Sequence, residues 1–130
     1  MESMLFPKQD KILETLRQIK EAILLLQEWN REVSDADDYL LSANGMKNLA
    51  ASCMLIESIG EGFKKIDKDS NSQLLSLWPS IPWKAVMGMR NQIAHGYFNI
   101  DAEIVFDTVK NDLEPLLQAT LFFISKLSTN

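Results

Sequence analysis

Residues 8–32 read KQDKILETLRQIKEAILLLQEWNRE, and this stretch decides the fold class. Its apolar residues recur at alternating spacings of four and three, the pattern of an α-helix with one buried stripe: Ile12, Leu16, Ile19, Ile23 and Leu26. Further apolar residues widen that surface beyond one face: Leu13, Leu24, Leu25 and Trp29. Such a helix needs packing partners on two sides, which either the rest of a bundle or a second subunit can supply.

The same spacing predicts a second long helix over about Met46 to Lys65. Gly60 and Gly62 near its end mark either a close approach of another helix or a fraying terminus. Asn44-Gly45 is interpreted as a break before this helix, and the polar residues 67–72 as a loop after it.

Two more helices are expected in the second half of the chain. One begins at Ile81-Pro82-Trp83 and stops near His95, because Gly96 is a natural residue to follow a helix C-terminus. The other begins after Asp101, which is expected to cap it, and repeats the apolar spacing to Leu127. Pro115 lies inside this last helix and should kink it, because proline has no N–H to donate.

Shorter elements complete the predicted fold. Ser34 and Asp37 resemble a capping box that opens a short helix over Ala36 to Ser42, and Leu74 to Trp78 is a turn or a short helical fragment. No internal repeat or strand alternation is found. The sequence therefore predicts a single all-α domain over residues 1–130, a bundle of about four long helices plus short ones.

Composition favours a folded cytoplasmic protein. The chain has 130 residues, 46% hydrophobic and 24% charged, which suits one domain with a core. It has neither an apolar run of about eighteen residues nor a recognisable secretory signal, so no membrane association is expected. Cys53 is expected to be a buried thiol, and one Cys with one His argues against a metal site. The net charge of −5 argues against a wide phosphate-binding surface, but not against a small site for one phosphate.

Residues 87–98, MGMRNQIAHGYF, interrupt the apolar pattern with a polar cluster. His95 is the only histidine of the chain, Arg90 precedes it by five residues, and Tyr97 follows by two. Asn91 shares a helical stripe with His95. We therefore expect the end of this helix to present a guanidinium, an amide, an imidazole and a phenol around one point.

This set of groups suits phosphodiester cleavage without a metal. The planar fork of Arg90 matches phosphate oxygens and stabilises charge that develops on them, and His95 can transfer a proton near neutral pH. RNA supplies its own nucleophile, the 2′-hydroxyl. One histidine cannot readily be base and acid in a single step, so this interpretation predicts a homodimer with two motif helices near the two-fold axis.

The residues alone also allow a purely structural explanation. In it, Arg90 is a surface arginine, His95 has a hydrogen-bond partner in its own chain, and Asn91 is a local cap. Tyr97 and Phe98 are then core aromatics. Such residues are common in helices, so their chemistry by itself leaves both explanations open.

Arg90, His95 and Tyr97 form the pattern Arg-x4-His-x-Tyr. With its neighbours IPWKAVMGMRN at 81–91 and HGYFNID at 95–101, and with LIESIGEG at 55–62, the chain resembles the HepT-like branch of the HEPN superfamily. The similarity covers about residues 8–127. Arg-x4-His alone is a weak pattern, but the flanking segments make it fairly specific.

The resemblance implies a metal-independent RNase toxin of a two-gene toxin–antitoxin pair. Arg90 and His95 would be catalytic at a dimer cleft, with no cofactor. Asn91 would be a polar helper, although many relatives carry an acidic residue at that position. The implied antitoxin resembles a minimal nucleotidyltransferase, which in this family can neutralise the toxin by transferring AMP onto the motif tyrosine, here Tyr97.

A second class of function competes with the RNase. The chain could be a non-catalytic HEPN module that docks beside a nucleotidyltransferase and holds its nucleotide or substrate. The acidic net charge mildly favours this module. The joint presence of Arg90, His95 and Tyr97 favours the RNase, because a scaffold has no chemical need for all three.

Overall fold

The computed structural model describes residues 6–93 and 99–128, and every element in these ranges is helical. The longer helices are α1 (Gln9–Trp29), α2 (Ala43–Asp69), α5 (Ala102–Asn111) and α6 (Leu113–Ser128). The short ones are η1 (Ala36–Tyr39), η2 (Leu75–Leu77), α3 (Trp83–Met87) and α4 (Met89–Ile93). The predicted all-α class, with four longer helices and several short ones, is confirmed.

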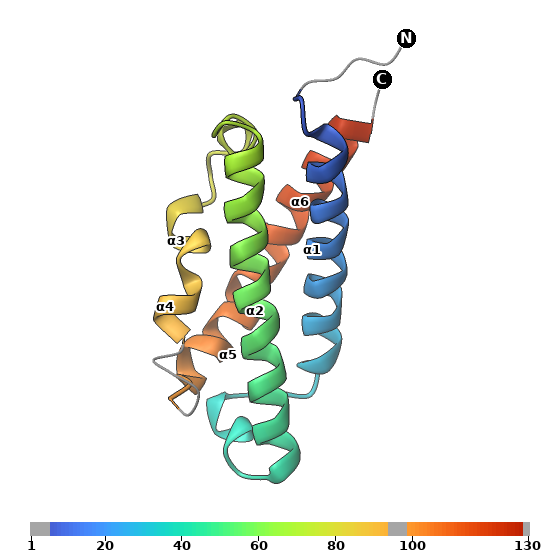
Figure 1. The fold of residues 1–130 in the computed structure, drawn as a ribbon. Coiled ribbons are helices and arrows are strands. Elements are labelled where there is room, and N and C mark those ends of the chain that lie inside the picture. The colour runs from blue at the N-terminus through green and yellow to red at the C-terminus, as the bar shows by residue number, and fades with distance from the viewer. Residues whose placement is uncertain (1–5, 94–98, 129–130) are drawn as a thin grey trace.

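Helix α1 lies at one side of the bundle (Figure 1). It packs against both α2 and α6, while α3 and α4 lie along the other side of α2 (Figure 1). The stripe predicted to be buried is at most 3% exposed: Ile12, Leu16, Ile19, Ile23 and Leu26. Burying a large apolar side chain contributes about 1.5–3 kcal/mol, so this stripe is a main source of the bundle's stability.

The second apolar face of α1 is only partly covered. Leu13 packs against the core, but Leu24, Leu25 and Trp29 are 40%, 43% and 41% exposed. The described part of the chain therefore supplies two packing partners for α1, which are α2 and α6, and still leaves part of its second apolar face in solvent.

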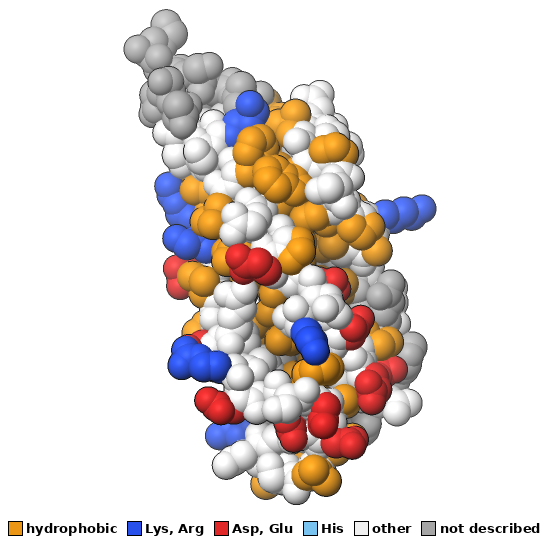
Figure 2. Space-filling model, turned by 180° about the vertical axis from the view of Figure 1, so that it is seen from behind, with side chains coloured by type: hydrophobic (Ala, Val, Ile, Leu, Met, Phe, Trp, Pro, Cys, Tyr) orange, Lys and Arg blue, Asp and Glu red, His pale blue; other side chains and the backbone are white. Residues whose placement is uncertain are grey.

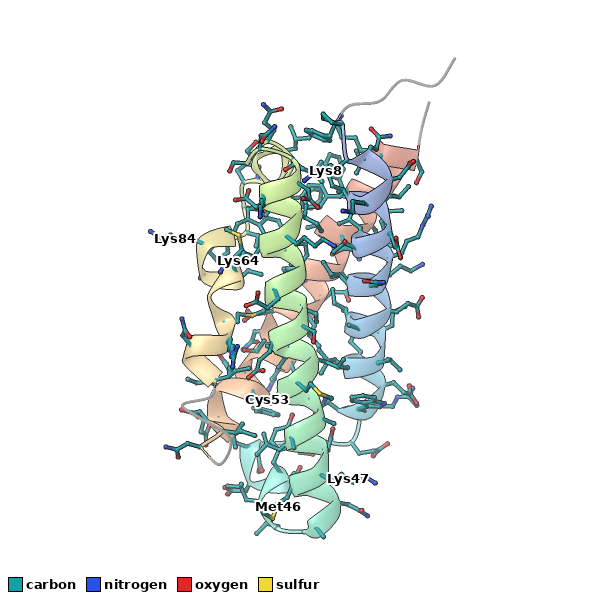
Figure 3. All side chains as sticks on the ribbon, in the orientation of Figure 1. Lys8, Met46, Lys47, Cys53, Lys64 and Lys84 are labelled. Atoms are coloured by element: carbon teal, nitrogen blue, oxygen red, sulfur yellow. The ribbon has the colours of Figure 1, made fainter. Side chains whose placement is uncertain are left out.

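Two polar contacts join the helix ends at the top of the bundle in Figure 1. Lys8, labelled in Figure 3, lies 3.4 Å from the carboxylate of Asp69, whose side chain is 7% exposed. The Gln9 side chain donates to the Leu127 carbonyl at 3.0 Å. These contacts join the start of α1 to the ends of α2 and α6.

A buried polar ring joins the other end of α1 to α2. The Asn30 side-chain amide donates to the Ser52 hydroxyl at 2.9 Å, and Ser52 donates to the side-chain oxygen Oδ1 of Asn48 at 3.0 Å. The Asn48 side-chain amide donates back to Oδ1 of Asn30 at 3.3 Å. The Tyr39 hydroxyl also donates to that Asn30 oxygen, at 2.6 Å. Burial raises the pKa of Tyr39 to about 12, so this phenol stays a donor at neutral pH.

Two local expectations in the first half of the chain were wrong. The capping box uses Asp35 and Asp38 rather than Ser34 and Asp37, and its short helix ends at Tyr39. Asn44-Gly45 does not break the chain: the hydroxyl of Ser42 accepts the Gly45 N–H at 2.9 Å, which starts α2 there. A good cap therefore outweighs the low helix propensity of the residues that follow it.

The end of α2 also differs from the expectation. The helix extends to Asp69, so half of the predicted polar loop is helical, and the chain turns only at Asn71 and Ser72, whose φ angles are 54° and 61°. Gly60 marks a close approach, since a Cβ there would lie 2.9 Å from the carbonyl oxygen of Val86 on α3. The fraying alternative is thereby excluded.

The last predicted helix is divided in two. α5 ends at Asn111 and α6 begins at Leu113, with Asp112 between them. Pro115 lacks the N–H that would bond the Asn111 carbonyl, so the break falls where that hydrogen bond is missing. Asp101 caps α5 as predicted, because its carboxylate accepts the Ile104 N–H at 3.1 Å.

Candidate active site on α4

The motif helix is interrupted at Gly88, which was not expected. α3 ends at Met87 and α4 begins at Met89, and the Gly88 N–H donates to the carbonyls of Lys84 and Ala85, both at 3.2 Å. Glycine is a poor helix former, and α3 is already fixed by its close approach to α2. The helix predicted to run unbroken from Ile81-Pro82-Trp83 towards His95 is therefore wrong, because it is divided in two at Gly88.

Aromatic packing holds α3 in place. The indole N–H of Trp83 donates to the Trp78 carbonyl at 2.9 Å. Its rings lie 4.9 Å from the Phe63 ring and 5.8 Å from the Phe123 ring, centroid to centroid. Such pairs contribute about 0.5–1.5 kcal/mol beyond burial. Trp83 thus joins α3 to both α2 and α6, and gives α4 a rigid support.

Helix α4 presents two of the predicted site residues to solvent. Met89 and Ile93 are 8% and 1% exposed and anchor the helix to the core. Arg90 and Asn91, between these anchors, are exposed. In the described part of the chain Arg90 forms no ion pair, so its guanidinium is available to an external anion.

The segment that carries His95 and Tyr97 lies outside the described residues. The backbone N–H of Asp101 donates to the Ile93 carbonyl at 2.9 Å. This bond joins the end of α4 to the residue that caps α5. Ile93 and Asp101 are therefore in contact at the end of the helix that carries Arg90 and Asn91.

Two lysines near α4 were not assigned a role from the sequence. Figure 3 places Lys84 on α3 and Lys64 on the neighbouring part of α2, and both are exposed. Gly60 contacts the Val86 carbonyl, and Lys64 is one helical turn beyond Gly60. Only the contact between Gly60 and Val86 brings the two helices that carry these lysines side by side, since twenty residues separate Lys64 from Lys84 in the sequence.

Cys53 is buried beside this region and is not a nucleophile. Its thiol donates to Glu57 at 3.7 Å, and its side chain is 4% exposed. Burial and the neighbouring Glu57 carboxylate raise the pKa of Cys53 to about 11, so the unreactive thiol predominates at neutral pH. The expectation of a buried thiol is confirmed.

The described residues contain no group of three or more His, Cys, Asp or Glu side chains that could hold a metal ion. None of their helices is both long and apolar enough to cross a lipid bilayer.

Comparison with known proteins assigns the chain to a family. The sequence model of the family described as ribonuclease HepT-like matches residues 10–121, which includes α4 and the whole Arg-x4-His-x-Tyr motif. The chain belongs to the ribonuclease HepT-like family. The predicted resemblance to HepT-like proteins is therefore confirmed.

Several named proteins are similar to this chain. "Probable ribonuclease HepT" of Thermococcus cleftensis is 36% identical over 101 residues, which cover 78% of this chain and 84% of that protein. A Methanocaldococcus jannaschii protein, whose name describes it as an inferred RNase, is 40% identical over 58 residues. These residues cover 45% of this chain and 47% of that protein.

A second M. jannaschii protein has a compound name. It joins a gamma-glutamylcyclotransferase to an inferred RNase and is 29% identical over 116 residues, 88% of this chain and 48% of its own length. The chain thus matches only about half the length of some of these relatives. No solved structure gives a significant match.

Proposed function

We propose that this HepT-like chain is a metal-independent RNase toxin of a two-gene toxin–antitoxin pair, acting in the cytoplasm. One observation carries the proposal: the family match includes the whole Arg-x4-His-x-Tyr motif, and α4 holds Arg90 of that motif in solvent between two buried anchors. The relatives' names, which give ribonuclease or RNase, support RNA as the substrate class.

The chemistry follows from the groups of the motif. The 2′-hydroxyl of RNA attacks the adjacent phosphorus, and the bond from phosphorus to the 5′-oxygen of the next nucleotide breaks. His95 accepts the hydroxyl proton or donates one to the leaving oxygen. Arg90 binds the non-bridging phosphate oxygens and stabilises the extra negative charge on them in the transition state. Asn91, exposed on the same short helix, is a polar helper that orients substrate.

A second copy of the chain would complete this site. Cleavage needs a base and an acid at once, and each chain has one histidine. A two-fold axis near α4 would supply two histidines and two arginines. The partly exposed apolar face of α1, with Leu24, Leu25 and Trp29, is a second surface for association between chains, on the other side of α2 from α4 (Figure 1).

The distribution of charge favours one direction of approach for RNA. Seen from behind, acidic side chains gather over the lower half of the molecule (Figure 2), where Figure 1 places α5 and η1. Lys64 and Lys84 instead lie on α2 and α3, next to the helix that carries Arg90. Like charge repels phosphate from the acidic side, so the strand would arrive across α2 and α3.

The partner would be a nucleotidyltransferase of the minimal type. Transfer of AMP from ATP to the Tyr97 phenol forms a phosphodiester and releases pyrophosphate. The added group carries one negative charge beside Arg90. It would compete with substrate phosphate for the guanidinium and repel incoming RNA, so the toxin would be switched off without unfolding.

A non-catalytic module is the second candidate function. The net charge of −5 favours it, because an RNA-binding protein of this size commonly has a basic surface. In this alternative, Arg90 would hold a phosphate of the partner's nucleotide rather than of RNA.

The deciding experiment compares Arg90→Ala with a control that removes another exposed cation. Lys47 lies at the far end of α2 from Lys64 in Figure 3 and suits this purpose. We expect Arg90→Ala to lower the RNA cleavage rate by about 100-fold or more, which is typical for loss of one charge-stabilising donor. Lys47→Ala should retain the rate, and EDTA should not affect either protein.

The two candidate functions give different results. Cleavage that is equal in Arg90→Ala and Lys47→Ala would exclude Arg90 as a catalytic residue. Loss of cleavage on adding EDTA would contradict the metal-independent mechanism. Complete absence of cleavage, with Arg90-dependent binding of the nucleotidyltransferase, would favour the non-catalytic module.

A further inference from the structure

Three large apolar side chains are exposed at the turn between η1 and α2. Leu40, Leu41 and Met46 are 55%, 79% and 57% exposed, and we call these three residues the apolar tip. Figure 3 places Met46 at the lower end of the bundle, near the start of α2. Single apolar side chains on a surface are ordinary, but several within residues 40–46 mark a surface that another molecule covers.

The backbone that carries the apolar tip is fixed by hydrogen bonds and by one close contact. The Asp38 N–H donates to the Asp35 carboxylate at 3.2 Å as part of the capping box of η1. The Gly45 N–H donates to the Ser42 hydroxyl at 2.9 Å. A Cβ added to Gly45 would clash with the Asp38 carbonyl oxygen, so η1 and the start of α2 are in backbone contact. The apolar tip therefore lies on a rigid support.

Tyr39 explains why the two leucines after it stay in solvent. Its side chain is 0% exposed and its hydroxyl donates to Asn30, so it takes the interior position of this turn. The N–H groups of Leu40 and Leu41 both donate to the Asp37 carbonyl, at 2.9 and 3.2 Å. Because the backbone is already fixed, a partner that covers the leucines gains apolar burial without the entropic cost of ordering this turn.

The apolar tip follows a run of acidic side chains. Within residues 31–47 these are Glu32, Asp35, Asp37 and Asp38. The cations of that stretch are Arg31, which pairs with Glu28, and Lys47. η1 also packs against α5, whose first turn adds Glu103. Apolar and acidic side chains lie together at this end of the molecule in Figure 2. A cationic surface therefore complements the tip, whereas the tip of a second copy would be repelled.

We propose that the apolar tip is a docking surface for a protein partner that presents an amphipathic helix with lysine or arginine beside its apolar face. The apolar face would cover the tip, and the cations would pair with Asp35 and Asp37, which are both exposed. Helices of this kind carry apolar side chains along one stripe and long cationic side chains on its flanks. The acidic residues favour such a partner over an anionic lipid surface, which they would repel.

The apolar tip lies at the end of the bundle where α4 ends (Figure 1). η1 contacts α5, and the residue that caps α5, Asp101, donates to the Ile93 carbonyl at the end of α4. A partner bound at the tip would therefore lie near the junction of α4 with α5, next to the candidate active site. Its binding does not depend on whether the chain cleaves RNA, so the two proposals are tested separately.

Nuclear magnetic resonance titration of the ¹⁵N-labelled full chain tests the proposal with two synthetic helical peptides of about 14 residues. One peptide carries leucines on one face and lysines on the other, and in the second peptide glutamates replace the lysines. We expect the lysine peptide to shift the amide signals of Leu40, Leu41 and Met46 with a dissociation constant of about 0.1 mM. The glutamate peptide should bind about ten-fold more weakly, because its charge has the sign of the acidic residues beside the tip.

Matched variants locate the contact. Leu41→Ser removes the most exposed side chain of the tip and should weaken binding of the lysine peptide about five-fold. Its control is Leu77→Ser on η2, a leucine that is 45% exposed and has no acidic residue within residues 70–80, and this variant should retain the affinity. Asp37→Asn should weaken binding about two-fold, whereas Asp10→Asn, which changes an exposed acid at the start of α1, should not.

Several results would overturn the proposal. They are absence of shifts at about 1 mM lysine peptide, equal affinity for the glutamate peptide, shifts that avoid the tip, and equal effects of a tip variant and its control. Two other occupants are tested with the same proteins. If Leu41→Ser is monomeric in sedimentation where the parent chain is oligomeric, a second copy covers the tip. If the parent chain binds phosphatidylcholine vesicles and Leu41→Ser does not, a lipid surface covers it. Either result would exclude the helical partner.

Discussion

Gly60 on α2 and Val86 on α3 are in backbone contact: a Cβ atom added to Gly60 would lie 2.9 Å from the Val86 carbonyl oxygen. Backbone carbonyls cannot move away as the end of a flexible side chain can. This contact fixes the distance between α2 and the short helices that lead to Arg90. The position of the candidate site therefore depends on a residue with no side chain.

Gly60→Ala should separate α3 from α2. Insertion of one methyl group into a tight contact costs about 1–3 kcal/mol of stability, and the free energy of unfolding in urea measures this loss. Gly88→Ala is the control, because its added Cβ would meet the Lys84 carbonyl at an ordinary 3.5 Å. Equal effects of the two substitutions would show that helix propensity, rather than the α2–α3 contact, governs Gly60.

Asn30→Ala should destabilise the fold strongly. The substitution removes the acceptor of the Tyr39 hydroxyl and the donor to Ser52, and leaves buried polar groups unpaired. Each such group costs about 1–3 kcal/mol, so we expect a total loss of about 2–4 kcal/mol. Thermal and urea unfolding measure it. Asn111→Ala, which removes only an exposed bond to Asp107, should cost less than about 0.5 kcal/mol.

Cys53 should make stability fall at alkaline pH. Its pKa is about 11 in the folded chain against an ordinary value of 9.0, so the proton is held more tightly in the folded state. The contribution of the Cys53 thiol to the free energy of unfolding is then fully present below about pH 9. It falls as the pH rises towards 11, by about 1 kcal/mol at pH 10. Cys53→Ala should show a correspondingly smaller decline between about pH 8 and pH 10, and a parallel decline in both proteins would exclude Cys53 as the cause. Tyr39, whose pKa is higher still, ionises above this range.

Tyr97→Phe should separate RNA cleavage from its regulation. If AMP is transferred to the phenol, the variant should keep RNase activity within about ten-fold and resist the nucleotidyltransferase, since only the acceptor oxygen is lost. His95→Ala should lose cleavage by about 100-fold or more but remain modifiable. Intact mass after incubation with the partner, ATP and magnesium measures the transfer. An equal mass increase in Tyr97→Phe and the parent chain would place the AMP elsewhere.

The sequence predicted the features that depend on local spacing and capping. Ile12, Ile19 and Leu26 recur at helical intervals, and their burial follows from that pattern alone. Asp101 was recognisable as a cap because its side chain needs only the N–H of a residue three positions later. Arg90 was predicted to be a site residue from its motif; it is exposed, and its role stays a prediction.

Features that depend on contacts between distant residues were not predictable. The break at Gly88 occurs because α2 already fixes α3, and no pattern within residues 81–95 reveals that contact. Ser34 and Asp37 have the spacing of a capping box as well as Asp35 and Asp38 do, so the spacing rule could not choose between them. The roles of His95 and Tyr97 stay predictions, since both lie outside the described residues.

The polar ring of Asn30, Ser52 and Asn48 also has a consequence for the order of folding. α1 and α2 are neighbours in sequence, so the ring closes a short loop and needs no contact with α6. Contacts between neighbours in sequence form at a low entropic cost, and such units often fold and unfold together. We expect α1, η1 and α2 to assemble as an early hairpin. α3 and α4, the second of which carries Arg90, would then pack onto the surface of this hairpin. On unfolding they would separate from it first.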